Sequence, residues 1–169
     1  MKPTTYPIEG PWNGQLAIVA RPRGNDWLEE EIRDLAKEKF QVVVSLLTDD
    51  EANELGLSLE GKLAVKEGLD FISFPIEDYA VPVSDEATFE LVIKLAEMLK
   101  RRLNIGIHCR AGIGRSSLIV ACLLSLTQSV EEAFSQISKS RGARVPDTEV
   151  QRNWVQRFAE AHSTFVVVG

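Results

Sequence analysis

Hydrophobic positions along the chain follow two alternating patterns. Short unbroken apolar runs predict buried strands, and apolar residues spaced three or four apart predict helices. The expected strands are Leu16–Ala20, Gln41–Leu47, Leu69–Phe74 and Ile105–His108. The expected helices follow a cap at Asn25 or Asp26, cover Asp49–Leu55 and Glu60–Glu67, start at Ser84 and Ser116, and lie near 130–139 and 147–161. Strands that alternate with helices predict an α/β fold, in which helices cover both faces of a mainly parallel sheet.

The helix that starts at Ser84 carries the clearest end signals. Asp85 and Glu86 stand in its first turn and Lys100–Arg102 in its last, which complements the helix dipole at both ends. The inward stripe of this helix is expected to consist of Phe89, Val92, Ala96 and Leu99.

The pattern divides the chain into one domain and two short ends. Residues 1–14 contain three prolines and two glycines, which predicts an irregular arm before a domain of residues 15–162. The tail, residues 163–169, is expected to be an edge strand or disordered. The first residues lack the apolar core of a secretory signal. The longest apolar run, Leu118–Leu124, is too short to span a bilayer, so no membrane insertion is expected.

Composition and charge narrow the function classes. With 19 Lys and Arg against 25 Asp and Glu, the 169 residues carry a net charge of −6, which argues against a nucleic-acid partner and a polybasic membrane anchor. Cys109 and Cys122 are too few for a disulfide framework and favour a reducing cytoplasm. The two histidines, His108 and His162, make no metal-binding pattern. No metal or cofactor is expected, and a monomer is favoured.

The segment Ile107–Ser117 carries the chemical signal. Cys109 follows a predicted buried strand, and six residues later Arg115 stands at the start of a predicted helix. Gly112 and Gly114 lie between them and allow the backbone to curl closely around a ligand. The amide N–H groups of residues 110–115 can then point inward and form an anion site at the positive end of the helix. Open α/β sheets bind ligands at this position, beyond the carboxyl ends of the strands.

The charge around this loop favours an ionised cysteine. No Asp or Glu occurs from Met98 to Val130, whereas five Lys and Arg residues do. Inward amides, a helix N-terminus and a guanidinium lower the pKa of a cysteine from ~8.5 to between ~3.5 and ~7.5. The same cradle would bind a phosphate dianion, and Arg115 offers a planar fork for two of its oxygens. The loop therefore predicts a nucleophile, Cys109, beneath a phosphate receptor.

The motif His108-Cys109-x-x-Gly112-x-x-Arg115-Ser116 resembles the signature loop of cysteine-dependent protein tyrosine and dual-specificity phosphatases. The similarity extends from about residue 14 to about residue 161. The loop sequence CRAGIGRSS is closer to the compact dual-specificity branch than to the larger tyrosine-specific domains. The resemblance implies hydrolysis of phosphomonoesters on a phosphorylated protein or peptide, through a phosphocysteine intermediate. It implies that Cys109 is the nucleophile, that Arg115 binds the phosphoryl group, that Ser116 stabilises the leaving thiolate, and that His108 organises the loop. The other loop residues expected to contact substrate are Arg110, Ala111, Gly112, Ile113 and Gly114.

The reaction also needs an acid, because an alkoxide or phenoxide leaves poorly near neutral pH. The resemblance places this acid on an Asp about thirty residues before the cysteine. Asp78 lies 31 positions before Cys109 in a proline-flanked loop, and we assign it as the acid and then as the base that activates water. Glu77 and Asp85 are the rivals. Glu77 is expected to be a solvent-exposed neighbour of Asp78, and Asp85 fits better as a charge at the start of a helix.

Several further residues have two readings each. Gln151 resembles the glutamine with which some relatives position the hydrolytic water, but it also suits a solvated helix face. Arg21 and Arg23 either line the mouth of the pocket or belong to a solvated turn. Tyr79 either stacks on substrate or packs locally, and Cys122 is expected to lie in the core.

Other activities remain open on the same loop. A phosphoinositide or small-molecule phosphatase is one, although the lysines usual in the lipid enzymes are replaced here by Ala111 and Ile113. A rhodanese-like sulfurtransferase or an arsenate reductase also uses Cys-x5-Arg, but Cys122 is poorly placed as a resolving cysteine. A phosphate-binding module without activity usually lacks the cysteine, the arginine or the acid. A Cys–His hydrolase is disfavoured, because His108 projects from the opposite strand face to Cys109.

Overall fold

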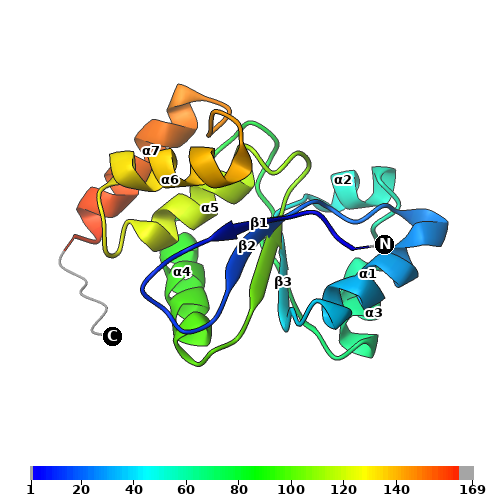
Figure 1. Cartoon of the computed structure of the whole chain (residues 1–169). Coiled ribbons are helices and arrows are strands. Elements are labelled where there is room, and N and C mark those ends of the chain that lie inside the picture. The colour runs from blue at the N-terminus through cyan, green and yellow to red at the C-terminus, as the bar shows by residue number, and fades with distance from the viewer. Residues whose placement is uncertain (1, 164–169) are drawn as a thin grey trace.

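The computed structural model describes residues 2–163 and contains a five-stranded sheet between helices (Figure 1). Its strands are β1 (Thr5–Ile8), β2 (Leu16–Val19), β3 (Val42–Ser45), β4 (Asp70–Ser73) and β5 (Ile105–His108). They lie in the order β1-β2-β5-β3-β4, and only the β1–β2 pair of this sheet is antiparallel. The predicted α/β class with a mainly parallel sheet is confirmed.

Helices cover both faces of the sheet, as the sequence predicts. The helical elements are η1 (Asn25–Trp27), α1 (Leu28–Lys37), α2 (Asp49–Glu54), α3 (Glu60–Lys66), α4 (Asp85–Lys100), α5 (Arg115–Leu124), α6 (Val130–Arg141) and α7 (Glu149–Ala161). The α4–α7 group covers one face, and α1 and α3 cover the other (Figure 1). Among the described residues, no helix is long and apolar enough to cross a membrane.

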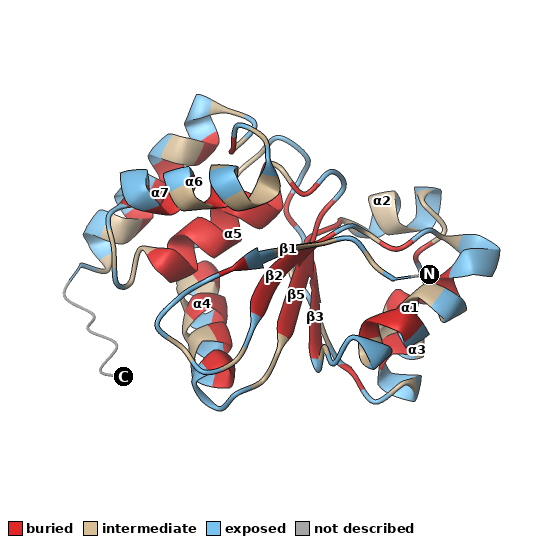
Figure 2. Cartoon of the chain, in the orientation of Figure 1, coloured by how far each residue is buried: buried red, intermediate tan, exposed pale blue. Residues whose placement is uncertain are grey.

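Burial explains why the central strands read as unbroken apolar runs. Every residue of β2, β3 and β5 is buried, because each of these strands has neighbours on both sides and helices on both faces (Figure 2). All ten residues of α5 are buried as well, so this helix forms the centre of its layer. The position of Arg115, at the start of α5, is therefore set by the most enclosed helix of the fold.

The buried face of α4 differs in part from the predicted stripe. Val92 and Leu99 are buried as expected, but Phe89 and Ala96 are only half-buried. The core side instead includes Thr88, Leu91, Leu95 and Met98. Helix α4 packs against α5 as well as against the sheet. A wider face of α4 is therefore buried than the single predicted stripe of residues.

The prediction of an irregular N-terminal arm is wrong for residues 5–8. These residues form β1, whose register pairs Tyr6 with Ile18 and Ile8 with Leu16. Pro7 is tolerated because β1 is an edge strand, where a missing N–H costs no ladder hydrogen bond. The expectation for the tail concerns residues 164–169, which lie outside the described residues.

Candidate active site

The catalytic loop, residues 109–114, connects the carboxyl end of β5 to the N-terminus of α5. Cys109 is buried, and the Gly112 N–H donates a hydrogen bond to its Sγ atom at 3.2 Å. Gly112 has a φ of 70°, in the left-handed region that favours glycine. A main-chain donor aimed at sulfur beside a helix N-terminus stabilises a thiolate more than a thiol. The structure therefore directs one main-chain N–H of this loop, that of Gly112, at the Cys109 sulfur.

Arg115 is almost completely buried, and its guanidinium is held from several sides by Glu51, Ile76 and Asp78. Its Nη1 and Nη2 atoms donate to the two carboxylate oxygens of Glu51 at 2.7 and 2.9 Å, and Nη1 also donates to the Ile76 carbonyl at 2.8 Å. Burial alone would lower the pKa of Arg115. The bonds to Glu51 and the attraction of the Cys109, Glu51 and Asp78 charges outweigh burial and raise that pKa. The guanidinium is thus a fixed, permanent cation.

Glu51 is a site residue that our reading of the sequence missed. Thr48 and Glu51 form a capping box at the start of α2, in which each side chain bonds to the other residue's backbone N–H. Burial alone would raise the pKa of Glu51, but the bonds from Arg115 and Thr48 lower it overall. The T-x-x-E spacing marks such a cap in the sequence. It does not show that the same carboxylate reaches Arg115, 64 positions away.

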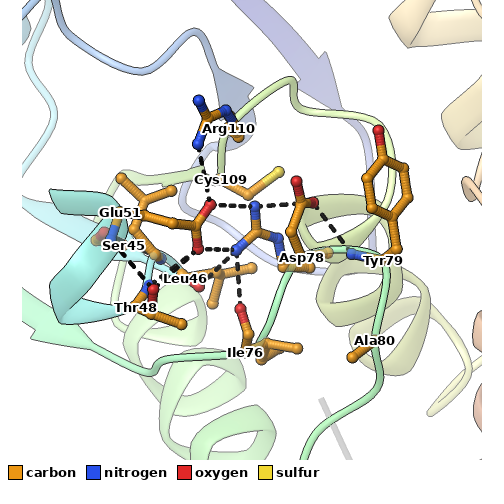
Figure 3. A network of polar contacts seen from close by, with 12 residues as sticks. Ser45, Leu46, Thr48, Glu51, Ile76, Asp78, Tyr79, Ala80, Cys109 and Arg110 are labelled. Atoms are coloured by element: carbon orange, nitrogen blue, oxygen red, sulfur yellow. Dashed lines mark hydrogen bonds and ion pairs between the residues drawn. The ribbon is translucent and has the colours of Figure 1, made fainter. Parts of the chain in front are cut away.

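Asp78 meets Arg115 from a different loop. Its Oδ1 atom lies 3.0 Å from Arg115 Nη2 and accepts a hydrogen bond from the Tyr79 N–H at 3.1 Å (Figure 3). The rivals take other places, since Glu77 is exposed and Asp85 is the first residue of α4. Among the three candidates, Asp78 is the carboxylate joined by an ion pair to the Arg115 guanidinium.

His108 and Ser116 flank the reactive residues in the interior. The fully buried His108 places Nε2 2.6 Å from Glu60 Oε1 and Nδ1 3.3 Å from the Cys109 carbonyl oxygen. Glu60 is the second site residue that the sequence analysis did not identify. It lies 48 positions before His108, and no local pattern marks it. Within residues 2–163, the buried Ser116 hydroxyl has no hydrogen-bond partner. The hydroxyl of the next residue, Ser117, is also buried without a partner in this part of the chain. A buried hydroxyl in this state is available to donate to an anion formed during a reaction.

The N-terminus of α7 closes another side of the site. Gln151 is buried, accepts a hydrogen bond from the Thr148 N–H and donates one to the Ala80 carbonyl at 3.1 Å, which ties α7 to the loop that carries Asp78. Asp147 was also missed: its carboxylate lies so close to Gly114 that a methyl group there would collide with it. Partial burial and the Asp78 charge raise the pKa of Asp147, against the opposing effect of Arg115.

The remaining candidates lie apart from this cluster or have other partners. Arg110 is half-exposed and faces Glu51 and Glu54 of α2, at 3.8 and 3.6 Å. Arg23 pairs with Glu31 and lies over the Trp27 ring. Cys122 is fully buried, and burial raises the pKa of its thiol well above the ordinary value, so its place in the core is as predicted.

Comparison with known proteins finds similarity to tyrosine phosphatases. The chain is 32% identical over 95 residues to rat (Rattus norvegicus) cyclin-dependent kinase inhibitor 3, a match that covers 54% of this chain and 44% of the relative. It is 27% identical to protein tyrosine phosphatase PRL-1 of Leishmania major, covering 63% of this chain and 65% of the relative. The match therefore spans less than half the length of the rat protein.

Solved structures share the fold over almost the whole chain. Kinase associated phosphatase superposes with a TM-score of 0.89 at 21% identity, covering 98% of this chain and 99% of that one. Tk-PTP in its active form gives a TM-score of 0.77 at 27% identity, covering 95% and 99%. A family model described as "Polymorphic toxin system, DSP-PTPase phosphatase" matches residues 17–128. Because this match spans more than half of the chain, and the catalytic loop with it, the chain belongs to that family of DSP-PTPase phosphatases.

Proposed function

We propose that this chain hydrolyses phosphomonoesters on tyrosine, and on serine or threonine, of phosphorylated proteins through a phosphocysteine intermediate. The observation that carries the proposal is the meeting of three groups: Cys109 of the catalytic loop, Arg115 at the start of α5, and Asp78 of the loop after β4. Cys109 receives a main-chain N–H at 3.2 Å, and the buried Arg115 guanidinium and Asp78 lie 3.0 Å apart beside it. A nucleophile, a phosphate-binding cation and a carboxyl acid are the parts that metal-independent phosphoryl transfer needs.

In the first step, the Cys109 thiolate attacks phosphorus while the inward N–H groups and Arg115 bind the phosphoryl oxygens. The S–P bond forms, the P–O bond to the leaving group breaks, and Asp78 gives its proton to the departing oxygen. Phosphoryl oxygens would compete for the Arg115 Nη2 atom that holds Asp78 at 3.0 Å. That competition releases the Asp78 carboxyl toward the leaving oxygen.

In the second step, the Asp78 carboxylate takes a proton from water as the water oxygen attacks phosphorus. Phosphate leaves and the Cys109 thiolate is restored, stabilised by the buried Ser116 hydroxyl. We assign Gln151 to orient this water, because its Nε2 atom stands beside Gly114 at the mouth of the loop. We assign His108 to hold the start of the loop through its contact with the Cys109 carbonyl.

Hydrolysis of 4-nitrophenyl phosphate in the presence of EDTA, with and without vanadate, tests the proposal. We expect turnover that survives EDTA, is blocked by vanadate and is abolished in Cys109→Ser. Cys122→Ala is the matched control, because it removes the other buried thiol, which lies within α5 and outside the catalytic loop. Turnover that persists in Cys109→Ser would overturn the assignment of the nucleophile.

The substrate class is tested with a panel of phosphotyrosine, phosphoserine and phosphothreonine peptides beside inositol phosphates and phosphoinositides. We expect the peptides to be hydrolysed with the higher kcat/KM. Faster turnover of the inositol substrates would show that the substrate is a phosphoinositide or inositol phosphate and not a phosphorylated protein. We further propose that the chain works in the cytoplasm as a monomer without nucleic-acid partners, which its two unpaired thiols and its net charge of −6 support. Light scattering tests the monomer.

A further inference from the structure

A second arginine, outside the signature motif, holds the outer side of the catalytic loop. Arg141 is the last residue of α6, and the chain turns away after it because Gly142 adopts a left-handed φ of 71°. The Arg141 Nε atom donates to the Gly112 carbonyl at 3.1 Å, and Nη2 donates to the Ala111 carbonyl at 3.0 Å. Two successive carbonyls of the loop are thus bound by one planar guanidinium.

These two bonds determine where the loop's N–H groups point. The C=O and N–H of one trans peptide unit are rigidly coplanar and point in opposite directions. The Ala111 carbonyl shares its peptide unit with the Gly112 N–H, which is the donor to Cys109 Sγ. The Gly112 carbonyl shares its unit with the Ile113 N–H. Holding both carbonyls outward on Arg141 therefore holds both N–H groups inward, toward the sulfur and the bound phosphate.

Tyr6 holds Arg141 in turn. The Arg141 guanidinium lies over the Tyr6 ring, 4.2 Å from its centroid, in a cation–π contact. Tyr6 belongs to β1 and pairs in register with Ile18 of β2, so its backbone is fixed by the sheet. Within residues 2–163, Arg141 forms no ion pair with a carboxylate, which leaves its charge directed at the loop. Both Tyr6 and Arg141 lie outside residues 17–128, the part of the chain that matches the family model.

We propose that Arg141, supported by Tyr6, is a positioning residue that keeps the catalytic loop in its oxyanion-binding conformation. The proposal rests on the proposed function but concerns a step that can be measured without turnover. Without Arg141, the Ala111–Gly112 and Gly112–Ile113 peptide units are free to rotate, and each rotation replaces an inward N–H by an inward carbonyl. Such a loop repels a phosphate and also loses a donor to the Cys109 thiolate.

The test compares Arg141→Ala with Arg152→Ala. Arg152 is a matched control, because it also lies over an aromatic ring, that of Phe134, and donates to a carbonyl, that of Val145, but makes neither contact with the loop. Tungstate affinity is measured by calorimetry, and the alkylation rate of Cys109 by iodoacetate is followed with pH. The loss of two charge-assisted bonds predicts tungstate binding weakened by about 10- to 100-fold in Arg141→Ala and alkylation shifted to higher pH. Arg152→Ala should bind tungstate within about twofold of the unchanged protein.

Substitutions of Tyr6, and a conservative substitution of Arg141, distinguish a positioning role from a general effect on folding. Tyr6→Phe keeps the ring and should bind tungstate as the unchanged protein does, whereas Tyr6→Leu should weaken binding several-fold. If Arg141→Ala does not fold, Arg141→Lys decides, because one ammonium cannot hold two carbonyls in a planar fork and binding should still weaken. Unchanged tungstate affinity and alkylation in the folded Arg141 variant would overturn the proposal, as would equal losses in Arg152→Ala. A protein that binds tungstate without hydrolysing any phosphate ester would overturn the proposed function and leave the positioning role intact.

Discussion

The link between Glu51 and Arg115 allows a quantitative prediction. Glu51→Gln keeps the side-chain size and, because glutamine also serves at this position of a capping box, keeps the start of α2. The change removes the negative charge that faces Arg115 and replaces one acceptor oxygen by an NH2 group that cannot accept. It therefore isolates the ion pair from the helix cap.

The size of the effect follows from the burial of the pair. Arg115 and Glu51 expose only 1% and 12% of their side chains, and their two bonds measure 2.7 and 2.9 Å. Breaking a buried pair costs about 3–5 kcal/mol, and we expect the lower end because Asp78 and the Ile76 carbonyl still hold Arg115. For a chain of this size, about 3 kcal/mol lowers Tm by about 6–12 °C. A less firmly held Arg115 should also lower kcat/KM by about 10- to 100-fold.

The stability loss should depend on pH with a defined sign. The pKa of Glu51 is lowered in the folded chain, so the carboxylate stabilises the fold above its unfolded pKa of about 4.3. That stabilisation disappears as the pH falls through the lowered folded pKa. The difference in Tm between the unchanged protein and Glu51→Gln should thus be largest near pH 7 and should disappear as the pH falls below about 4.

Calorimetric scans between pH 3 and pH 8, together with kcat/KM for 4-nitrophenyl phosphate at pH 7, measure both effects. Glu54→Gln is the control, because Glu54 stands on the same helix, is exposed, and faces Arg110 at 3.6 Å. An exposed pair of this kind contributes less than about 1 kcal/mol. An unchanged Tm at pH 7 in Glu51→Gln, or an equal loss at every pH, would refute the reasoning.

Three further predictions concern the carboxylates around the site. Asp78→Ala should slow the hydrolysis of phosphotyrosine more than that of 4-nitrophenyl phosphate, because the poorer leaving group depends more on receiving a proton. The control Glu77→Ala should leave both rates unchanged. Equal slowing of both substrates in Asp78→Ala would assign the proton to another group. Asp147→Asn should raise Tm at pH 7 and have no effect below about pH 3, because a raised pKa makes the ionised form a cost to folding; a lower Tm at pH 7 would contradict this. Glu60→Leu should cost about 2 kcal/mol in urea unfolding by leaving the buried His108 ring without its 2.6 Å partner, and an unchanged midpoint would count against that bond.

The residues that could be predicted from the sequence are those whose roles depend on local backbone. Cys109 begins the loop between β5 and α5, Arg115 begins α5 directly after it, and the spacing of Gly112 and Gly114 indicates how that loop turns. Asp78 was assigned from the family resemblance and from the proline-flanked loop after β4. The structure brings all three together because parallel strands place their carboxyl ends at one edge of the sheet.

The residues that were missed act across long sequence distances. Glu51, Glu60 and Arg141 reach the site from α2, α3 and α6, and each is one of many charged residues on a helix face. Their contacts depend on how the helices pack, which periodicity does not describe. The edge strand β1 was missed for a different reason, since Pro7 and its neighbours have the composition of a loop, and pairing with β2 outweighs that local preference.

The account depends most on covalent catalysis by Cys109, and trapping the intermediate tests it directly. The protein is mixed with an aryl phosphate, quenched in denaturant within milliseconds, digested and examined by mass spectrometry. Ser116→Ala is included because slower breakdown should raise the trapped fraction. We predict one added phosphoryl group on the peptide that contains Cys109, more of it in Ser116→Ala, and none in Cys109→Ser. A phosphoryl group on another side chain, or rapid turnover with no modified Cys109, would contradict the account.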